Sequence, residues 1–478
     1  MLSKSEKITS APLVMKFGGT SVGDASAFNR VADIISAHST MHPVVVVSAM
    51  SRVTDDLVSI IRIATDGDAD KAVNALYKPL GRYLSVIQRL LTKESSAIES
   101  AIERARSEIA ELLRAAESIP QRRAVWQDAV ISYGEQLSAT LLAAVLRESG
   151  LRASFVDARR CIVTDDVHGC ATPLMPESER RIVQEIVPLL EASEIPVLGG
   201  FIGSSQEGVT TTLGRNGSDY TASLVGAALT ASEIQIWTDV SGILTADPRL
   251  IMGARTISRL TYLEAAELSY FGAKVLYPKA LQPAAARLIP MTIRNSLAPD
   301  ETGTLISCEI EERPLPVKAI VHKTPVAIVR IASNRNLRPH QFLRAILEVF
   351  DRYQTIIDVM TLSEVSVTLL LDDVSTLSFL VEDLEHLGAI KIDYQRAIIS
   401  VIGAELRCMA AVAARVFSAL SNIDVLLISQ SLSSPSLKLV IDGGELEEVM
   451  VRLHETFFER TIEGNATVGA FETLGQGY

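Results

Sequence analysis

The sequence predicts an α/β protein, with a mostly parallel sheet between helices in its first part and a smaller repeated module behind it. The apolar run Pro12–Phe17 leads into two glycines, and a helical pattern over 25–37 separates it from the β-branched run Pro43–Ser48. Strand, glycine turn, helix and strand in this order begin a βαβ unit. After residue 325 the pattern strand–helix–strand–strand–helix–strand occurs twice, and the phrase IDVM at 357–360 recurs as IDVL at 423–426.

The remaining elements fit this division. Additional strands are expected at four places in the first part of the chain: 154–156, 195–198, 233–237 and 291–294. Helical sequence over 55–146 and 261–276 accompanies them. Residues 309–316 are charged and contain two prolines, which is typical of a linker. We therefore expect an α/β domain over 1–307, a linker over 308–325, and repeat units over 326–396 and 397–478, with the C-terminal tail returning to the first unit.

Charge and cysteine content narrow the class of partner. The net charge of −12 argues against a nucleic-acid backbone, because proteins that bind one carry a basic face. No apolar run approaches the roughly 18 residues that a membrane span needs. The four cysteines form no C-x-x-C pair, so we expect reduced thiols and no metal site made of protein ligands: Cys161, Cys170, Cys308 and Cys408. A cytoplasmic protein with neither a nucleic-acid nor a membrane partner is predicted.

The segment KFGGTS at 16–21 lies between the first strand and the first helix. Glycines let backbone amides approach an anion closely, and a helix N-terminus adds partial positive charge. Lys16 stands at the strand end, where an ammonium can neutralise charge on a transferring phosphoryl group. The segment lacks the G-x-x-x-x-G-K-[ST] pattern of a P-loop, and a plain tight turn with a solvated lysine is the alternative interpretation.

A second glycine-rich segment, TTTLGRNGSD, occupies 210–219. Ser218 is predicted to cap a helix over 219–229, Arg215 to hold a carboxylate in a bidentate fork, and Asp219 to orient Lys16 or a bound cation. The alternative is an ordinary capped helix after a turn, in which the arginine and the aspartate lie on the surface. Residues 210–219 are therefore a second candidate site.

Three further segments carry polar groups at places where they matter for binding. Thr238 and Asp239 follow a strand, where α/β sheets place ligands, and Arg249 follows the turn-forming pair Asp247-Pro248. Lys274 ends an apolar helix, which also suits the helix dipole. Glu135 sits inside helical sequence, where a glutamate is usually solvated, and is a candidate for binding a substrate ammonium group. For each of them a polar loop or a solvated helix face is the alternative.

Taken together, these segments resemble aspartate kinase of the amino-acid kinase superfamily. The similarity runs in order through KFGGTS at 16–21, SYGE at 132–135, TTTLGRNGSDYTA at 210–222, TDVSGI and DPR within 238–249, FGAKVLYP at 271–278 and SEVSVTL at 363–369. It covers essentially the whole chain. The resemblance implies the amino-acid kinase fold followed by two ferredoxin-like ACT domains.

The resemblance also implies roles for individual residues. Lys16 is expected to stabilise the transferring γ-phosphoryl group, and Asp219 is expected to organise Lys16 and the phosphoryl site. The expected aspartate-binding residues are Ser48, Thr54, Glu135 and Arg215. The expected ATP-binding residues are Gly18, Gly19, Thr20, Ser21, Thr238, Asp239, Arg249, Lys274 and Val275. Leu244 stands where many members carry tyrosine, which weakens a stacking contact with the nucleotide.

The implied reaction is attack of the β-carboxylate of L-aspartate on the γ-phosphorus of ATP, with Mg²⁺ bridging the phosphates. It gives 4-phospho-L-aspartate and ADP, the first step toward lysine, threonine and methionine. The carboxylate is already ionised at pH 7, so no general base is needed. The alternatives are another acyl-phosphate-forming kinase of the superfamily and a catalytically dead amino-acid sensor.

The repeat units imply feedback regulation by an amino acid, with lysine favoured over threonine. Positions that match inhibitor contacts in lysine-sensitive members are Phe342, Asp358, Ser363 and Glu364. The effector loops 339–342 and 429–435 depart from the family pattern, since small residues that let backbone approach an effector are missing. Association through the ACT domains into a homodimer or homotetramer is expected.

Overall fold

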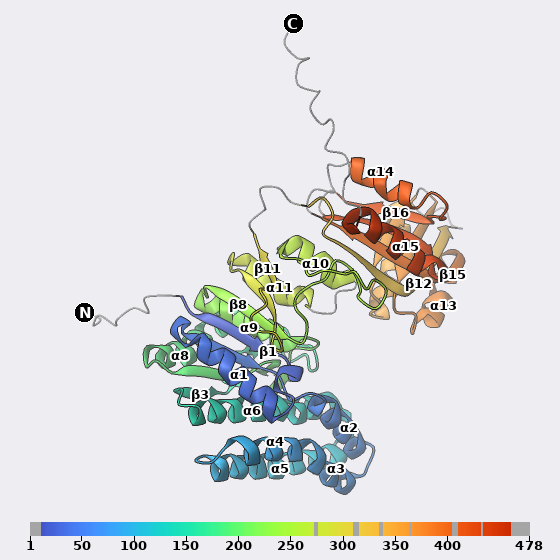
Figure 1. Cartoon of the computed structure of the whole chain (residues 1–478). Coiled ribbons are helices and arrows are strands. Elements are labelled where there is room, and N and C mark those ends of the chain that lie inside the picture. Colours follow the sequence, from blue (N-terminus) through green and yellow to red (C-terminus); the bar gives the residue numbers. More distant parts are fainter. Residues whose placement is uncertain are drawn as a thin grey trace, which may run out of the picture. The chain divides into compact units, whose positions relative to one another are not determined.

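The structure is a computed structural model that describes residues 11–271, 276–308, 315–333, 338–363, 365–403, 410–431 and 434–459 (Figure 1). The described residues form two compact units. The first unit contains residues 11–244 and 256–308, and the second contains 245–255 and 315–459. The chain therefore passes from the first unit to the second and back before its final crossing.

The first unit is built on an eight-stranded sheet with the order β3-β5-β2-β1-β8-β10-β11-β9. Its strands are β1 (Leu13–Phe17), β2 (Pro43–Val47), β3 (Ala153–Val156), β5 (Ile195–Gly199), β8 (Glu233–Thr238), β9 (Arg259–Thr261), β10 (Met291–Asn295) and β11 (Thr304–Ser307). All pairings are parallel except that of β10 with β11. The predicted strands and the parallel sheet are confirmed.

Strand β1 lies near the centre of this sheet, paired in parallel with β2 on one side and β8 on the other. Every residue of β1 and β2 is buried, which explains why both strands read as continuous apolar runs rather than alternating ones. Lys16 is the one charged residue in β1, and its neighbours in register are Val46 and Ile236.

Helices cover the sheet of the first unit: α1 (Ala25–Ala37), α2 (Val53–Thr65), α3 (Ala69–Ala75), α4 (Tyr77–Leu90), α5 (Ser95–Ser118), α6 (Arg123–Glu148), α7 (Ala158–Cys161), α8 (Met175–Glu191), α9 (Gly217–Leu229), α10 (Tyr262–Phe271) and α11 (Pro278–Ala286). Helix α1 begins after Asp24, whose carboxylate accepts from the Ala27 N–H at 2.9 Å. The predicted helix over 261–276 is observed as α10, and residues 272–275 lie outside the described residues.

Helix α6 is the core helix of this unit. It is long and apolar enough to cross a membrane by composition, but most of its apolar stretch is buried inside the protein. It packs against β3 and β5 on one side and against α2 and α5 on the other, and α4 adds a further layer beyond it (Figure 1). Its composition is therefore that of a buried helix in a three-layered region.

A small second sheet in the first unit was not predicted from the sequence. It contains β4 (Val163–Thr164), β6 (Ile202–Ser205) and β7 (Thr210–Thr212), in the order β4-β6-β7. Strands β6 and β7 form an antiparallel hairpin, and β7 leads directly into the turn before α9. This sheet thus determines where the chain enters the turn and helix start at residues 213–219.

The second unit has a six-stranded antiparallel sheet with the order β13-β14-β12-β15-β17-β16. Its strands are β12 (Ala319–Ser333), β13 (Val359–Leu362), β14 (Ser366–Leu371), β15 (Gly388–Ile402), β16 (Leu427–Gln430) and β17 (Ser436–Asp442). Its helices are α12 (Pro339–Arg352), α13 (Leu377–Glu385), α14 (Ala410–Ala419) and α15 (Leu446–His454). The order of strands and helices repeats as predicted.

The two repeats share their central strands. Strands β12 and β15 are 15 residues long each, and residues 319–323 pair with 398–402 whereas 326–333 pair with 388–396. The linker predicted over 308–325 therefore ends earlier than expected, because residues from Ala319 onward already form a strand. The linker was predicted from the two prolines within 309–316; the later Pro325 sits at a register shift within β12 and does not end the strand.

An excursion of the chain, residues 245–255, contributes to the second unit. Ala246 and Ile251 belong to the same apolar core as Ile320 and Val449. The Thr245 carbonyl accepts from the Ile320 N–H at 2.8 Å, and the Thr245 hydroxyl contacts the His454 ring at 3.2 Å. The predicted α/β domain over 1–307 is thus interrupted by a segment that folds with the repeats.

Candidate active site

A buried ion pair stands at the carboxyl end of β1. The Lys16 ammonium lies 2.5 Å from an Asp219 carboxylate oxygen, and the two side chains are 11% and 4% exposed. Asp219 sits in the first turn of α9, where the helix dipole favours a negative charge. The predicted pairing of these two residues is present, which gives a held ammonium at a strand end.

The glycine turn follows directly. A Cβ at Gly18 would lie 3.6 Å from the Lys16 ammonium, and a Cβ at Gly19 would meet the Ala49 carbonyl at 2.8 Å. Glycine is therefore required at position 19 by the close approach of the loop after β2. Residues Gly19–Val22 form a short 3-10 turn before α1, with Thr20 exposed and Ser21 buried. Gly18, which lies beside the lysine, and Gly19 are half-buried, and Thr20 is exposed.

The start of α9 differs in detail from the prediction. The helix begins at Gly217, two residues earlier than expected, and Asn216 precedes it in a left-handed conformation. Ser218 therefore lies inside the helix and is not its cap. Arg215 is exposed at the turn, and Gly200 faces Ser218 so closely that a Cβ there would meet it at 2.6 Å. The turn places the arginine outside and Asp219 inside.

Glu135 is a buried carboxyl group with spare capacity. One of its oxygens accepts from the Ala49 N–H at 3.3 Å, and the other has no hydrogen-bond partner among the described residues. Burial raises the pKa of the Glu135 carboxyl to about 8, because it is removed from water, and the Ala49 N–H opposes this shift. An ammonium group brought to the open oxygen would satisfy it. The alternative of a solvated helix-face glutamate is therefore wrong.

The loop after β2 connects Glu135 with the glycine turn. The Ser48 N–H donates to the Phe17 carbonyl at 3.1 Å, and the Ser51 N–H donates to the Gly19 carbonyl at 3.1 Å. Ser48 is half-buried after β2, and Thr54 is half-buried in the first turn of α2. The contacts through Ala49 thus place the predicted substrate loop, Glu135 and the Lys16 turn at one end of the sheet.

On the other side of β1, Thr238 ends β8 and Asp239 follows it, exposed. The Thr238 carbonyl accepts from the N–H of Ser296 at 2.8 Å, and the Ser296 hydroxyl contacts that of Ser21 at 2.8 Å. Ser296 ties the end of β10 to the glycine turn, and nothing in its local sequence indicated this. The predicted residues Lys274 and Val275 lie outside the described residues.

Arg249 belongs to the segment that folds with the second unit. Its guanidinium makes a two-pronged pair with the Asp247 carboxylate, and it is exposed. This pairing lowers the pKa of the Asp247 carboxyl. The pair is local, two residues apart, so a turn-forming Asp-Pro-Arg segment satisfies its own arginine.

The comparisons with known proteins agree with this geometry. The profile of the amino acid kinase family matches residues 11–295, and an ACT domain profile matches 399–457. Lysine-sensitive aspartokinase 3 of Escherichia coli is 34% identical over 455 residues, covering 94% of this chain and 99% of that protein. Aspartokinase 1 of Arabidopsis thaliana chloroplasts is 33% identical, covering 93% of this chain and 80% of that protein. The chain belongs to the aspartokinases of the amino acid kinase family.

Solved aspartokinase structures have the same fold. The structure of E. coli aspartokinase III in complex with aspartate and ADP matches with a TM-score of 0.82 and 33% identity, over 94% of this chain and all 100% of that one. Its complex with lysine and aspartate matches with a TM-score of 0.78, also at 33% identity, over 94% and 99% of the two chains. The aspartokinase fold therefore extends through both units.

The aspartokinase sensor positions have distinct surroundings in the second unit. Phe342 is packed in the apolar core between α12, α13 and the sheet, and Ser363 is exposed at the end of β13, where its hydroxyl contacts Ser366. Asp358, just before β13, has a fully buried side chain. Glu364 lies outside the described residues. Of these positions, Asp358 has the environment of a specific binding group.

Asp358 already holds an ammonium group that belongs to the chain itself. The Lys323 ammonium lies 2.5 Å from an Asp358 oxygen and 2.7 Å from an Asp372 oxygen. Burial raises the pKa of the Asp358 carboxyl, and Lys323 opposes that rise. The carboxylate pair recognises a primary ammonium, and the sequence did not indicate that Lys323 would be its partner.

Replacing the buried acid tests its raised pKa. Folded Glu135 binds a proton up to about pH 8, whereas an unfolded glutamate loses it near pH 4.5, so wild-type stability falls as pH rises between these values. Glu135→Gln cannot titrate, so it lacks this fall in stability with pH. The difference in melting temperature, variant minus wild type, is therefore expected to increase from pH 5 to pH 9, as measured by differential scanning fluorimetry. The exposed control Glu111→Gln should show no such trend, and an equal offset at both pH values would contradict the shifted pKa.

Removing the ammonium tests the catalytic assignment. Lys16→Ala is expected to leave a folded protein whose turnover is at least about a hundredfold lower, in the range of lost transition-state electrostatics. Turnover is measured by ADP release with saturating substrates, and folding by circular dichroism. Lys279→Ala, at an exposed site of α11, is the matched control and should keep wild-type turnover. A folded Lys16→Ala protein with normal turnover would remove Lys16 from its role.

Proposed function

We propose that this chain transfers the γ-phosphoryl group of ATP to the β-carboxylate of L-aspartate, giving 4-phospho-L-aspartate and ADP. The observation that carries the proposal is the open, buried Glu135 oxygen at the end of the sheet that also holds the Lys16–Asp219 pair. The same end of the sheet thus offers a carboxyl group that can bind an amino-acid ammonium and a lysine that can assist phosphoryl transfer. The complex of E. coli aspartokinase III with aspartate and ADP supports both substrates.

In the proposed reaction an oxygen of the β-carboxylate attacks the γ-phosphorus in line. The bond between this phosphorus and the bridging oxygen breaks, and its electron pair leaves on ADP. The ionised carboxylate supplies the nucleophile, so the site needs no proton acceptor. Lys16 offsets charge on the transferring group, and Asp219 holds the ammonium in place. Glu135 binds the substrate ammonium and Arg215 its α-carboxylate as a fork.

Magnesium would enter with the nucleotide. Mg²⁺ takes oxygen ligands, mostly phosphate oxygens and water, with one or two carboxylates. Within the described parts of the chain, no group of three or more His, Cys, Asp or Glu side chains could hold a metal ion. Asp219 is the carboxylate near the lysine that could contribute to such a shell. The bound Mg²⁺ would neutralise negative charge on the phosphates.

One assay separates this proposal from its alternatives. With ATP, Mg²⁺, L-aspartate and hydroxylamine, the acyl phosphate is trapped as a coloured hydroxamate, and its formation should require aspartate. A different carboxylate kinase would give product with another acid, such as L-glutamate, in parallel reactions. A catalytically dead sensor would give none, and absence of aspartate-dependent hydroxamate would contradict the proposal.

The second proposed activity is inhibition by lysine at the Asp358 site. The buried carboxylate already binds a primary ammonium, that of Lys323, and lysine carries such a group on a flexible stem. The similarity to lysine-sensitive aspartokinase 3 and the complex of E. coli aspartokinase III with lysine support the choice. On this proposal the effector ammonium competes with Lys323 for Asp358.

Removing the internal competitor tests the proposed effector site. Lys323→Gln leaves Asp358 and Asp372 without their ammonium, so lysine should inhibit at a concentration at least about threefold lower than for wild type. The measurement is the half-inhibitory lysine concentration in the hydroxamate assay. Lys391→Gln, an exposed lysine on the neighbouring strand β15, is the charge-matched control. Lysine insensitivity of both wild type and Lys323→Gln would contradict lysine sensing.

Association and location stay predictions. The proposed homodimer or homotetramer is supported by exposed apolar residues at the two edge strands of the second sheet, Met360 and Leu362 on β13 and Ile428 on β16. Unpaired edges with such residues are favourable sites for pairing with another chain.

We propose a cytoplasmic enzyme, in line with its reduced cysteines: Cys161, Cys170 and Cys308 are free thiols, and Cys408 lies outside the described residues.

A further inference from the structure

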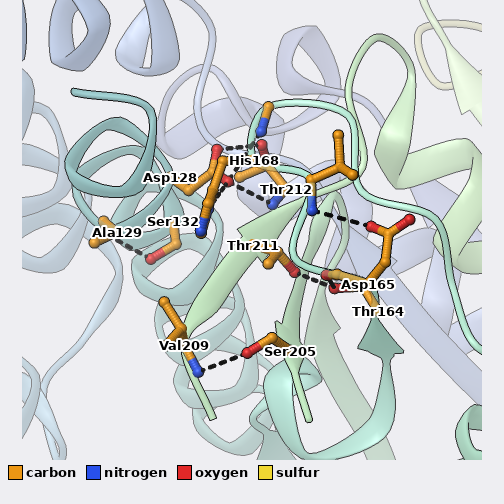
Figure 2. A network of polar contacts seen from close by, with 12 residues as sticks. Asp128, Ala129, Ser132, Thr164, Asp165, His168, Ser205, Val209, Thr211 and Thr212 are labelled. Carbon is orange, nitrogen blue, oxygen red and sulfur yellow. Dashed lines mark hydrogen bonds and ion pairs between the residues drawn. The ribbon is translucent and has the colours of Figure 1, made fainter. Parts of the chain in front are cut away.

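A fully buried carboxylate on α6 gathers an unusual number of donors. Asp128 is 0% exposed, and its first oxygen accepts from the Thr212 hydroxyl at 2.6 Å. Its second oxygen accepts from the N–H groups of Gly169 at 3.0 Å and Thr212 at 3.3 Å, and it contacts the His168 ring at 2.8 Å. Figure 2 shows Asp128 and His168 pointing toward one another. The reaction as described above uses none of these groups.

The donors come from two segments that are distant from α6 in the sequence. His168 and Gly169 belong to the loop between β4 and α8, and Thr212 ends β7. The loop and the strand are also tied to each other, since the Ala171 N–H donates to the Thr212 carbonyl at 2.8 Å. The hydroxyls of Thr164 and Thr211 add a contact of 2.7 Å (Figure 2). Asp128 is therefore the group at which helix, loop and strand meet.

On the helix side, this junction leads to the ammonium-binding carboxylate. Glu135 follows Asp128 on α6 by seven residues, which is about two turns, so both side chains project from the same face. The peptide between them is fixed within the core, since the Gly134 carbonyl accepts from the Tyr83 hydroxyl at 2.8 Å. A shift of α6 relative to β7 would therefore move Glu135 as well.

On the strand side, the junction leads to Arg215, three residues after Thr212. The loop that Asp128 holds lies against the turn between them, because a Cβ at Gly214 would be 3.3 Å from both the Cys170 sulfur and the Gly169 carbonyl oxygen. Gly214 has a φ of +79° and so adopts a conformation that suits glycine. The loop thus limits how the backbone beside Arg215 can move.

We propose that Asp128 is a positioning residue that fixes the separation between Glu135 and Arg215, and thereby sets the affinity for the amino-acid substrate. This inference rests on the proposed function, in which these two residues bind the ammonium and α-carboxylate of aspartate. Asp128 contacts neither Lys16 nor Asp219 in any hydrogen bond or ion pair of the described residues. Its loss therefore weakens amino-acid binding while ATP binding and phosphoryl transfer at saturation remain.

The first variant is Asp128→Asn, which keeps the shape of the side chain. It replaces one of the two acceptor oxygens with an NH2 group, which donates and cannot accept. The KM for aspartate is expected to rise at least about tenfold, whereas kcat and the KM for ATP stay within about threefold. Kinetics are measured with the hydroxamate assay at a temperature where melting curves show every variant folded. This split between KM and kcat separates positioning from a general loss of structure.

A second pair of variants keeps the test independent of the folding of Asp128→Asn. Thr212→Val removes the hydroxyl that donates at 2.6 Å but keeps the side-chain shape, and Thr212→Ser restores it. Thr212→Val should raise the aspartate KM about three- to tenfold, and Thr212→Ser should return it to within about twofold of wild type. Equal KM values for the two variants would overturn the proposal.

Ser178→Ala is the control for loss of a buried hydrogen bond nearby. Ser178 on α8 is buried and bonds to the backbone N–H and carbonyl of Val163, at 3.0 Å each, without touching the Asp128 network. It should lower the melting temperature and leave the aspartate KM unchanged. If it raises that KM as much as Asp128→Asn does, Asp128 has no special role. Failure of wild type to form any hydroxamate would instead overturn the proposed function, and this inference with it.

Discussion

The catalytic unit depends on one buried ion pair, between Lys16 on β1 and Asp219 at the start of α9. A lysine in the middle strand of a parallel sheet is costly to bury unless a carboxylate meets it, because each charge loses its water. The sheet therefore tolerates Lys16 only where α9 begins, and the helix start is fixed in turn by the turn of residues 213–216. The glycine turn, the loop after β2 and the end of β8 are arranged around that point.

Two carboxylates on one face of α6 show how environment assigns roles to the same chemical group. Asp128 meets four donors and is fully satisfied, whereas Glu135 meets one and keeps an open oxygen. A satisfied buried carboxylate stays in place and holds its neighbours, while an unsatisfied one is prepared for a cation. A helix that carries both can combine binding with alignment, since the spacing between them is fixed by its backbone.

Local patterns in the sequence predicted the parts of the fold that depend on local order. The strand runs and the glycine turn follow from periodicity and residue type within about 20 residues, and the repeat follows from a phrase at 357–360 that recurs at 423–426. The small sheet β4-β6-β7 was missed because its strands are two to four residues long, too short for a period to appear. The Asp128 network was missed because its partners lie 40 to 84 residues away in the sequence. Motif order, in contrast, indicated Lys16, Asp219 and Glu135 together.

The excursion at 245–255 means that neither structural unit corresponds to one continuous stretch of the sequence. The core of the second unit includes Ala246 and Ile251, which are encoded in the middle of the catalytic sequence. A chain cut after residue 312 would leave these apolar side chains without their cover, and residues 313–478 alone would lack part of their interior. A single cut in the sequence therefore cannot divide this protein into its two units, because residues 245–255 belong to the core of the second unit.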